Sequence, residues 1–133
     1  MMDQMTPREI LIVEDDQFLR EFYLELLQGE GYFVDEAADG EVAFKKIQNN
    51  QYNLVLLDIM LPKKDGVQIL KDLKLQPVKS PNSLIVVLSN IGQDAVIKEC
   101  FNLGASGFLI KSAMDPKQVL SEIKSFLDNT SNG

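Results

Sequence analysis

Five residues that could carry chemistry each stand at the end of an apolar run or just after one. They are the carboxylates Glu14, Asp15 and Asp58, the hydroxyl of Ser89 and the ammonium of Lys111. Carboxylates that gather at a sheet edge repel one another and need positive charge. With oxygen ligands alone, a hard cation such as Mg²⁺ is favoured over zinc. A cation, an ammonium and a hydroxyl around one carboxylate would together receive a phosphoryl group on Asp58.

Each of these residues also has an ordinary structural interpretation. An acidic residue after a strand often caps the next helix, and Asp15 or Asp16 could do only that. Ser89 on its own suits a turn, and an isolated lysine such as Lys111 is commonly a solvated side chain. Their combination, in order on several strand ends, is much harder to obtain by chance and favours one shared site.

The elements that must position these residues alternate along the chain. Short apolar runs predict strands at 10–13, 33–37, 54–57, 84–88 and 108–110. Helical spacing and capping residues predict helices at 17–28, 40–49, 66–73, 93–103 and from Pro116 to about Leu127. A polar loop with Pro77, Ser80 and Pro81 separates the third helix from the fourth strand.

Nearly wholly apolar strands separated by helices favour a parallel sheet that helices cover on both faces. The five strand–helix units predict an open doubly wound α/β fold, in which ligands bind at the carboxyl ends of the strands. We expect a single domain over residues 1–133, with a core at about 8–128. The polar ends at 1–7 and 129–133 are expected to be tails, the second of them frayed.

Composition excludes several classes of function. The net charge of −7 argues against direct binding to nucleic acid or to an anionic membrane. The absence of histidine removes His-based acid–base catalysis, His metal ligands and a Ser-His-Asp triad. Cys100 is the single cysteine, which fits a reducing cytoplasm and a small apolar residue on a helix. No apolar run is long enough for a membrane span, and no secretory signal opens the chain.

Four stretches together resemble the response-regulator receiver domain, of the CheY-like type, over essentially the whole chain. They are ILIVEDD at 10–16, LVLLDIMLPKKDG at 54–66, VVLSN at 86–90 and GASGFLIK at 104–111. The D-x-x-[LM]-P-x-x-[DN]-G pattern in the second stretch is specific. The resemblance implies a flavodoxin-like (CheY-like) fold with five βα units and strand order 2-1-3-4-5.

The resemblance also implies a metal site and a phosphoryl acceptor. Asp58 resembles the phospho-accepting aspartate. Asp15 is implied as a direct Mg²⁺ ligand, Glu14 as a ligand through water, and Met60 as a ligand through its backbone carbonyl. Mn²⁺ could take the place of Mg²⁺.

Further positions resemble the parts of the family's switch. Ser89 matches the hydroxyl that binds the phosphoryl group, and Lys111 matches the lysine that pairs with it. Phe108 matches the aromatic rotamer switch, which together with Ser89 would couple the site to the face of the fourth helix, fifth strand and fifth helix. Apolar residues in excess on the fourth helix could contribute to that surface.

Three positions depart from the family's pattern. Ser112 follows the lysine where proline is usual, with a peptide bond that is often cis, so the loop into the last helix could have a different shape. Phe108 lacks a tyrosine hydroxyl, so its two positions would differ only in packing. Asn90 places an amide where a small alanine is common, and the sign of its effect on dephosphorylation is open.

The expected function is a cytoplasmic phosphorylation switch, not an enzyme beyond self-phosphotransfer and autodephosphorylation. A sensor histidine kinase or a histidine phosphotransfer protein would phosphorylate Asp58, and a downstream protein effector would read the result. The chain is expected to be a monomer, or a dimer on phosphorylation, with no direct nucleic-acid or membrane partner. Its short polar end slightly favours a stand-alone receiver over a piece of a larger regulator.

Other functions fit less well. Haloacid-dehalogenase-type phosphatases need a second aspartate two residues after the first, and Met60 stands there. No P-loop occurs, and the acidic run at 14–16 would repel a flavin phosphate. The alternative that stays open is a receiver-like scaffold that binds partners without phosphorylation.

Overall fold

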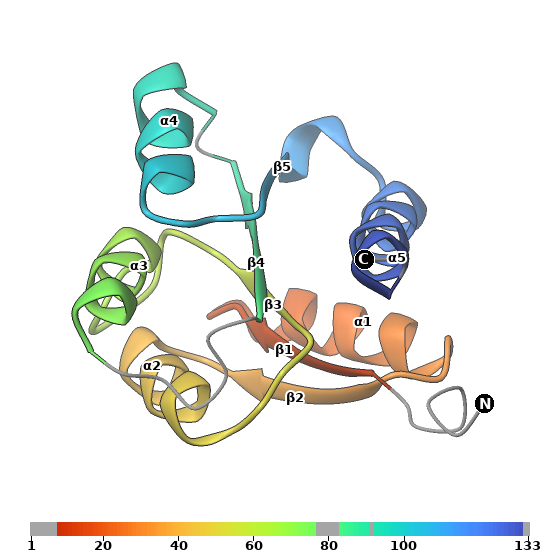
Figure 1. The fold of residues 1–133 in the computed structure, drawn as a ribbon. Helices are drawn as coiled ribbons and strands as arrows, with labels where there is room; N and C mark the ends of the chain where they lie inside the picture. The colour runs from red at the N-terminus through yellow and green to blue at the C-terminus, as the bar shows by residue number, and fades with distance from the viewer. Residues whose placement is uncertain (1–7, 77–82, 91, 132–133) are drawn as a thin grey trace.

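A five-stranded parallel sheet forms the centre of the protein (Figure 1), and its strands are ordered β2-β1-β3-β4-β5. This computed structural model describes residues 8–76, 83–90 and 92–131. The strands are β1 (Glu9–Val13), β2 (Phe33–Ala37), β3 (Leu54–Leu57), β4 (Leu84–Ser89) and β5 (Gly107–Ile110). The predicted doubly wound α/β fold and its strand order are confirmed.

Five α-helices connect and follow the strands among the described residues. They are α1 (Gln17–Gln28), α2 (Gly40–Asn49), α3 (Gly66–Leu75), α4 (Asp94–Asn102) and α5 (Pro116–Ser131). Among the parts of the chain that the structure describes, no helix is both long and apolar enough to cross a membrane. The predicted loop at Pro77, Ser80 and Pro81 lies outside the described residues.

At two places the predicted helix ends differ from the structure by more than one residue. Helix α3 continues to Leu75 rather than ending near residue 73, because Lys74 and Leu75 contain no helix breaker. Helix α5 continues to Ser131, so the residues from 129 to 131 are helical instead of forming a tail. Polar residues favour exposure but do not end a helix, and the sequence from 117 to 131 has neither proline nor glycine.

The helices cover both faces of the sheet. Figure 1 shows α1 and α5 on one side and α2, α3 and α4 on the other. Strand β1 serves both layers, since Leu11 and Val13 pack with the second group while Ile10 and Ile12 pack with the first. Burial on both faces explains why β3 and most of β1 are continuous apolar runs, whereas the edge strand β2 contains Asp35 and Glu36. Cys100 of α4 is fully buried, as expected for a small core residue.

Candidate functional site

The polar residues that follow the strands meet at the carboxyl edge of the sheet. Glu14 follows β1, Asp58 follows β3, Ser89 ends β4 and Lys111 follows β5. Glu14, Asp58 and Ser89 are the buried polar or charged residues among those described, at 5%, 6% and 1% exposure. The structure therefore places these four predicted residues at one edge of the sheet, and their roles in a site stay a prediction.

Lys111 joins two of these carboxylates. Its Nζ lies 2.6 Å from Oε1 of Glu14 and 3.0 Å from Oδ2 of Asp58. All three side chains are largely shielded from water, with side-chain exposures of 16%, 7% and 8%. Sequence reasoning placed Lys111 beside the phosphoryl acceptor, but it did not predict the direct pair with Glu14.

The carboxylates outnumber the ammonium. Oxygen atoms of Glu14, Asp15 and Asp58 lie within 4.8 Å of one another, and Lys111 supplies a single positive charge to the two buried ones. Three carboxylates and one ammonium leave a formal charge of −2 if all are ionised. An all-oxygen donor set with excess negative charge fits Mg²⁺ or Mn²⁺ and does not fit a soft metal.

The three acidic residues at 14–16 make different contacts. Asp16 caps α1, because its Oδ1 accepts the N–H of Leu19 at 3.0 Å. The N–H of Asp16 also donates to Oε2 of Glu14 at 3.1 Å. The exposed Asp15 is left with its side chain at the acidic cluster. Of the two residues that could have been caps only, the structure gives that task to Asp16.

Arg20 is a supporting residue that the sequence reasoning missed. Its Nη1 donates to the backbone carbonyl of Glu14 at 2.9 Å, and its Nε donates to Oε1 of Glu36 at 2.7 Å. The side chain of Arg20 is only 14% exposed. It therefore ties the loop after β1 to β2. The only sequence signal was a lysine or arginine one turn into the helix, which is too common to single out.

Burial acts in opposite directions on the pKa of Glu14 and the pKa of Lys111. It raises the pKa of Glu14, and it outweighs the hydrogen bonds from Lys111 and from the N–H of Asp16, which lower it. For Lys111, burial lowers the pKa, but the hydrogen bonds to Glu14 and Asp58 outweigh it and the net pKa is raised. Lys111 thus stays a cation. The charged form of its partner Glu14 is disfavoured by burial, and the hydrogen bonds from Lys111 and Asp16 offset only part of that cost.

The loop after β3 fixes Asp58 through a tight approach. A Cβ on Gly66 would lie 2.5 Å from the carbonyl oxygen of Asp58, so only glycine fits there. The N–H of Gly66 donates to the carbonyl of Ile59 at 2.8 Å. The N–H of Met60 donates to Oδ1 of Asp58 at 3.3 Å, while the Met60 side chain is exposed. The metal role expected for the Met60 carbonyl stays a prediction.

The expected switch residues lie along β4 and β5. Ser89 is paired in register with Ile110, and Phe108 is paired with Val87. Phe108 is half-buried and packs against the core on the α2, α3 and α4 side. The motion expected of Ser89 and Phe108 stays a prediction.

Two departures from the expected pattern have a defined local structure. Asn90 is exposed at the end of β4. Ser112 lies in a single 3₁₀ turn, Lys111–Ala113, between β5 and α5. No cis peptide bond occurs within the described residues, so the Lys111–Ser112 bond is trans. The sequence expectation that this loop could differ from a cis-proline loop agrees with that geometry.

Comparison with known proteins identifies relatives of this arrangement. The family model described as the response regulator receiver domain matches residues 10–124. The transcriptional regulatory protein SrrA of Staphylococcus aureus is 31% identical over 122 residues, which are 92% of this chain and 48% of SrrA. ResD of Bacillus subtilis is 29% identical over 130 residues, 98% of this chain and 52% of ResD. The chain spans about half the length of these curated relatives.

Solved structures of similar chains share the fold. A CheY-like response regulator receiver domain protein from Methanospirillum hungatei is 30% identical, with a TM-score of 0.85, and the match covers 96% of this chain and 98% of that one. A chain of the CheX–CheY–BeF3–Mg²⁺ complex from Borrelia burgdorferi is 31% identical, with a TM-score of 0.83 and coverage of 95% and 93%.

Proposed function

Because this chain belongs to the response-regulator receiver family, we propose that it is a switch that accepts a phosphoryl group on Asp58. The phosphodonor is a sensor histidine kinase or a histidine phosphotransfer protein. The observation that carries the proposal is the largely shielded Lys111, whose ammonium holds the buried Asp58 and Glu14 together at the carboxyl edge of the sheet. Asp58 is a buried carboxylate that shares one ammonium with Glu14, so its negative charge is only partly compensated and it can take a further positive partner.

The acidic cluster is the site for the metal. Asp15, Asp58 and the Met60 carbonyl would hold Mg²⁺ directly, and Glu14 would do so through water. When bound, Mg²⁺ supplies positive charge to the phosphoryl oxygens. The excess of carboxylates at Glu14, Asp15 and Asp58 supports this assignment.

The transfer itself is a substitution at phosphorus. A carboxylate oxygen of Asp58 attacks the phosphorus of the donor phosphohistidine, and the P–O bond forms as the P–N bond breaks. The imidazole nitrogen leaves with the electron pair and takes a proton from water. Lys111 already lies 3.0 Å from Oδ2 of Asp58, so its ammonium can follow the charge onto the phosphoryl oxygens. Water later hydrolyses the acyl phosphate and resets Asp58.

The signal leaves through the face formed by α4, β5 and α5. Phosphorylation adds about −1.5 to −2 charge and new acceptor oxygens, which would draw the hydroxyl of Ser89 and free space for Phe108. Phe101 of α4 is 46% exposed, and this supports a protein contact on that face. A shift from a mostly inactive to a mostly active population needs a preference of about 5 kcal/mol for the active form.

The phosphodonor approaches beside α1. Phe18 and Phe22 of α1 are 83% and 41% exposed, and Phe18 is two residues after the Asp16 cap. Exposed aromatic side chains next to a reaction site suit a contact with a partner helix. Glu21 and Glu25 line the same surface hollow, so basic residues on the partner would complement it.

Intact mass after incubation with acetyl phosphate and Mg²⁺ tests the acceptor chemistry. Wild type should gain one hydroxylamine-labile phosphoryl group, and the gain should disappear with EDTA or in Asp58→Asn. Asp35→Asn is the matched control, since Asp35 is also a strand carboxylate paired with a lysine, and it should be phosphorylated like wild type. Equal phosphorylation of Asp58→Asn would contradict the proposal.

A scaffold that binds partners without phosphorylation is the second candidate. It would be supported if neither acetyl phosphate nor a phosphorylated histidine phosphotransfer protein modified a folded wild-type chain. The retained Glu14, Asp15, Asp58 and Lys111 weigh against it, because a pure scaffold has no need of excess buried carboxylates.

A further inference from the structure

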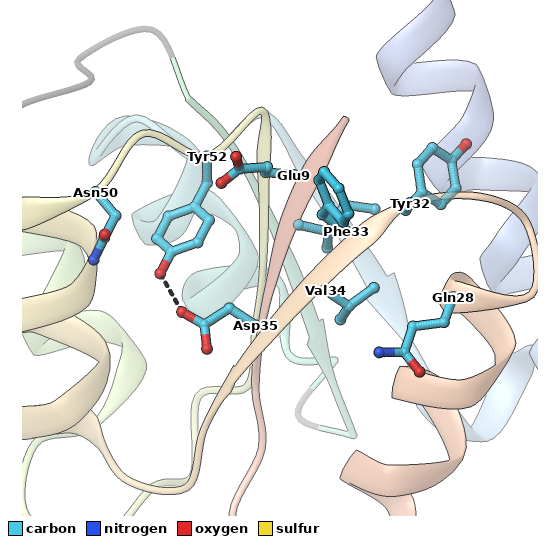
Figure 2. Close-up of a pocket in the computed structure, with 9 residues that line it drawn as sticks. Glu9, Gln28, Tyr32, Phe33, Val34, Asp35, Asn50 and Tyr52 are labelled. Atoms are coloured by element: carbon cyan, nitrogen blue, oxygen red, sulfur yellow. Dashed lines mark hydrogen bonds between the residues drawn. The ribbon is translucent and has the colours of Figure 1, made fainter. Parts of the chain in front are cut away.

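A pocket of about 320 Å³ lies around the start of β2, at the opposite end of the sheet from Asp58 (Figure 2). Its walls include Glu9, Tyr32, Phe33, Val34, Asp35 and Tyr52. The first residues of β1 and β2 form this pocket, whereas the phosphorylation site follows the last residues of β1 and β3. A ligand bound here would leave the phosphoryl acceptor open.

The polar groups on one wall of the pocket are already hydrogen-bonded to one another. The Oδ2 of Asp35 accepts the hydroxyl of Tyr52 at 2.6 Å (Figure 2), and Oδ1 lies 2.8 Å from Nζ of Lys46. Burial and this hydrogen bond raise the pKa of Tyr52, so its hydroxyl remains a donor to Asp35. This wall is held in place by its own contacts and offers a fixed aromatic surface.

The part of the pocket next to Tyr52 carries the carboxylate of Glu9 (Figure 2). Glu9 is exposed, and no ion pair to it occurs within residues 8–76, 83–90 and 92–131. Glu9 and Phe33 are direct neighbours across the β1–β2 pair, so their side chains lie on the same face of the sheet. The Phe33 ring is 61% exposed. A carboxylate beside an exposed aromatic ring suits a cation that can pair with one and stack on the other.

The backbone of the pocket has one open position. Strand β2 is an edge strand, and Phe33 uses its backbone to bond β1, so Val34 and Glu36 direct their backbone groups to the open side. The groups of Glu36 are taken, because its N–H donates to Asp35 and its carbonyl accepts from Lys46, both at 2.8 Å. Among the described residues of β2, the backbone groups of Val34 have no such partner at this edge, which allows a short added strand and prevents a long one.

We propose that this pocket binds the guanidinium group of an arginine on a partner protein, presented by a short extended segment that pairs with the backbone of Val34. Arginine fits better than lysine, because a planar guanidinium can stack on Phe33 while it pairs with Glu9. The backbone position requires a peptide, since a free amine would leave Val34 unused. The net charge of −7 also favours a basic partner.

The test uses the full chain labelled with ¹⁵N and the blocked peptide acetyl-Thr-Val-Arg-Val-Thr-amide. Amide resonances of Glu9, Phe33 and Val34 should shift on titration, and those of Asp58 should not. The same peptide with citrulline, which keeps the shape of arginine but not its charge, should bind about fivefold more weakly, as should Glu9→Gln with the arginine peptide. Glu41→Gln, an exposed carboxylate on α2, should bind like wild type.

Several results would overturn the proposal. These are no shifts at the pocket, equal binding of the citrulline peptide, or unchanged binding to a Glu9→Gln variant whose spectrum shows an intact fold. Arginine amide that binds as well as the peptide would refute the added strand. Pocket resonances that change on dilution without peptide would assign the surface to a second copy of the chain. Phosphorylation of Glu9→Gln by acetyl phosphate should match wild type, which separates this proposal from the phosphorylation switch.

Discussion

The protein has two clusters in which a lysine holds strand carboxylates, and they differ in how complete they are. Beside β2, Nζ of Lys46 lies 2.8 Å from Asp35. At the carboxyl edge of the sheet, Nζ of Lys111 lies 2.6 Å from Glu14 and 3.0 Å from Asp58. The distances are similar, but the Lys46–Asp35 pair is half-exposed and the Lys111 cluster is nearly buried.

The two clusters differ in the balance between burial and hydrogen-bond donors. Burial raises the pKa of Asp35, but the hydrogen bonds from Lys46, Tyr52 and the N–H of Glu36 outweigh it, and the net pKa is lowered. In the other cluster, burial outweighs the donors and the pKa of Glu14 is raised. The hydrogen bonds to Asp35 more than offset the cost of its burial, whereas those to Glu14 do not, and this difference supports the proposal that the Glu14–Asp58 cluster takes a cation or a phosphoryl group.

The largest effect should come from removing each lysine in turn. Lys111→Met should slow phosphorylation by acetyl phosphate by about 100-fold, because a preorganised donor to the developing charge is lost. The variant should also lose about 3 kcal/mol of unfolding free energy, since two buried carboxylates are left together. Lys46→Met should lose about 1 kcal/mol and keep the wild-type rate. Intact mass against time gives the phosphorylation rate, and urea unfolding gives the free energy of unfolding. Equal phosphorylation rates for the two variants would contradict the difference proposed between the two clusters.

The next effect concerns Mg²⁺. At ten times its Kd, Mg²⁺ should stabilise wild type by about 1.4 kcal/mol, because it binds the folded cluster and not the unfolded chain. Asp15→Asn should lose most of this stabilisation, and Asp35→Asn should keep it. Thermal unfolding with and without the ion measures the change. A stabilisation that survives in Asp15→Asn would place the ion elsewhere.

A smaller effect is expected from Tyr52→Phe. The change removes the hydroxyl that donates to Asp35 at 2.6 Å and should cost about 1 kcal/mol of unfolding free energy. Lys46 and the N–H of Glu36 still satisfy Asp35, so the loss stays small. Chemical denaturation measures it, and phosphorylation of the variant by acetyl phosphate serves as the control. A slower phosphorylation would show that the two clusters are coupled.

The smallest effect is a dependence on pH. The folded state lowers the pKa of Asp35 below its ordinary value of 3.8, so the stability that its carboxylate contributes is complete above that value. It is lost as the pH falls below 3.8, when the unfolded chain takes up the proton first. The stability gap between wild type and Asp35→Asn should therefore narrow in acid. A gap that widens as the pH falls would reverse the sign assigned to Asp35.

The fold, and the edge of the sheet at which the candidate site residues lie, could be predicted because they depend on local pattern. Short, nearly continuous apolar runs, and polar residues at their ends, place Glu14, Asp58, Ser89 and Lys111 at one edge. Helix α1 has the predicted bounds, since its cap at Asp16 and the glycine after Gln28 are both visible in the sequence.

Contacts between side chains that are far apart in the chain could not be predicted. The Lys111–Glu14 bond joins residues 97 positions apart, and it depends on side-chain conformations that no short pattern encodes. The pocket at Glu9 and Phe33 depends on the pairing of two strands at an open edge. The helical end of α5 was missed for a different reason, because polar residues without a breaker continue a helix as readily as they end it.

The most direct test of the central claim is to locate the acyl phosphate. Wild type is treated with acetyl phosphate and Mg²⁺ and then with borohydride, which reduces an aspartyl phosphate to homoserine, and the digested peptides are sequenced by mass spectrometry. We expect homoserine at residue 58 and unmodified residues at Glu14, Asp15 and Asp35. Homoserine at position 15 or 35 in place of 58 would contradict the account.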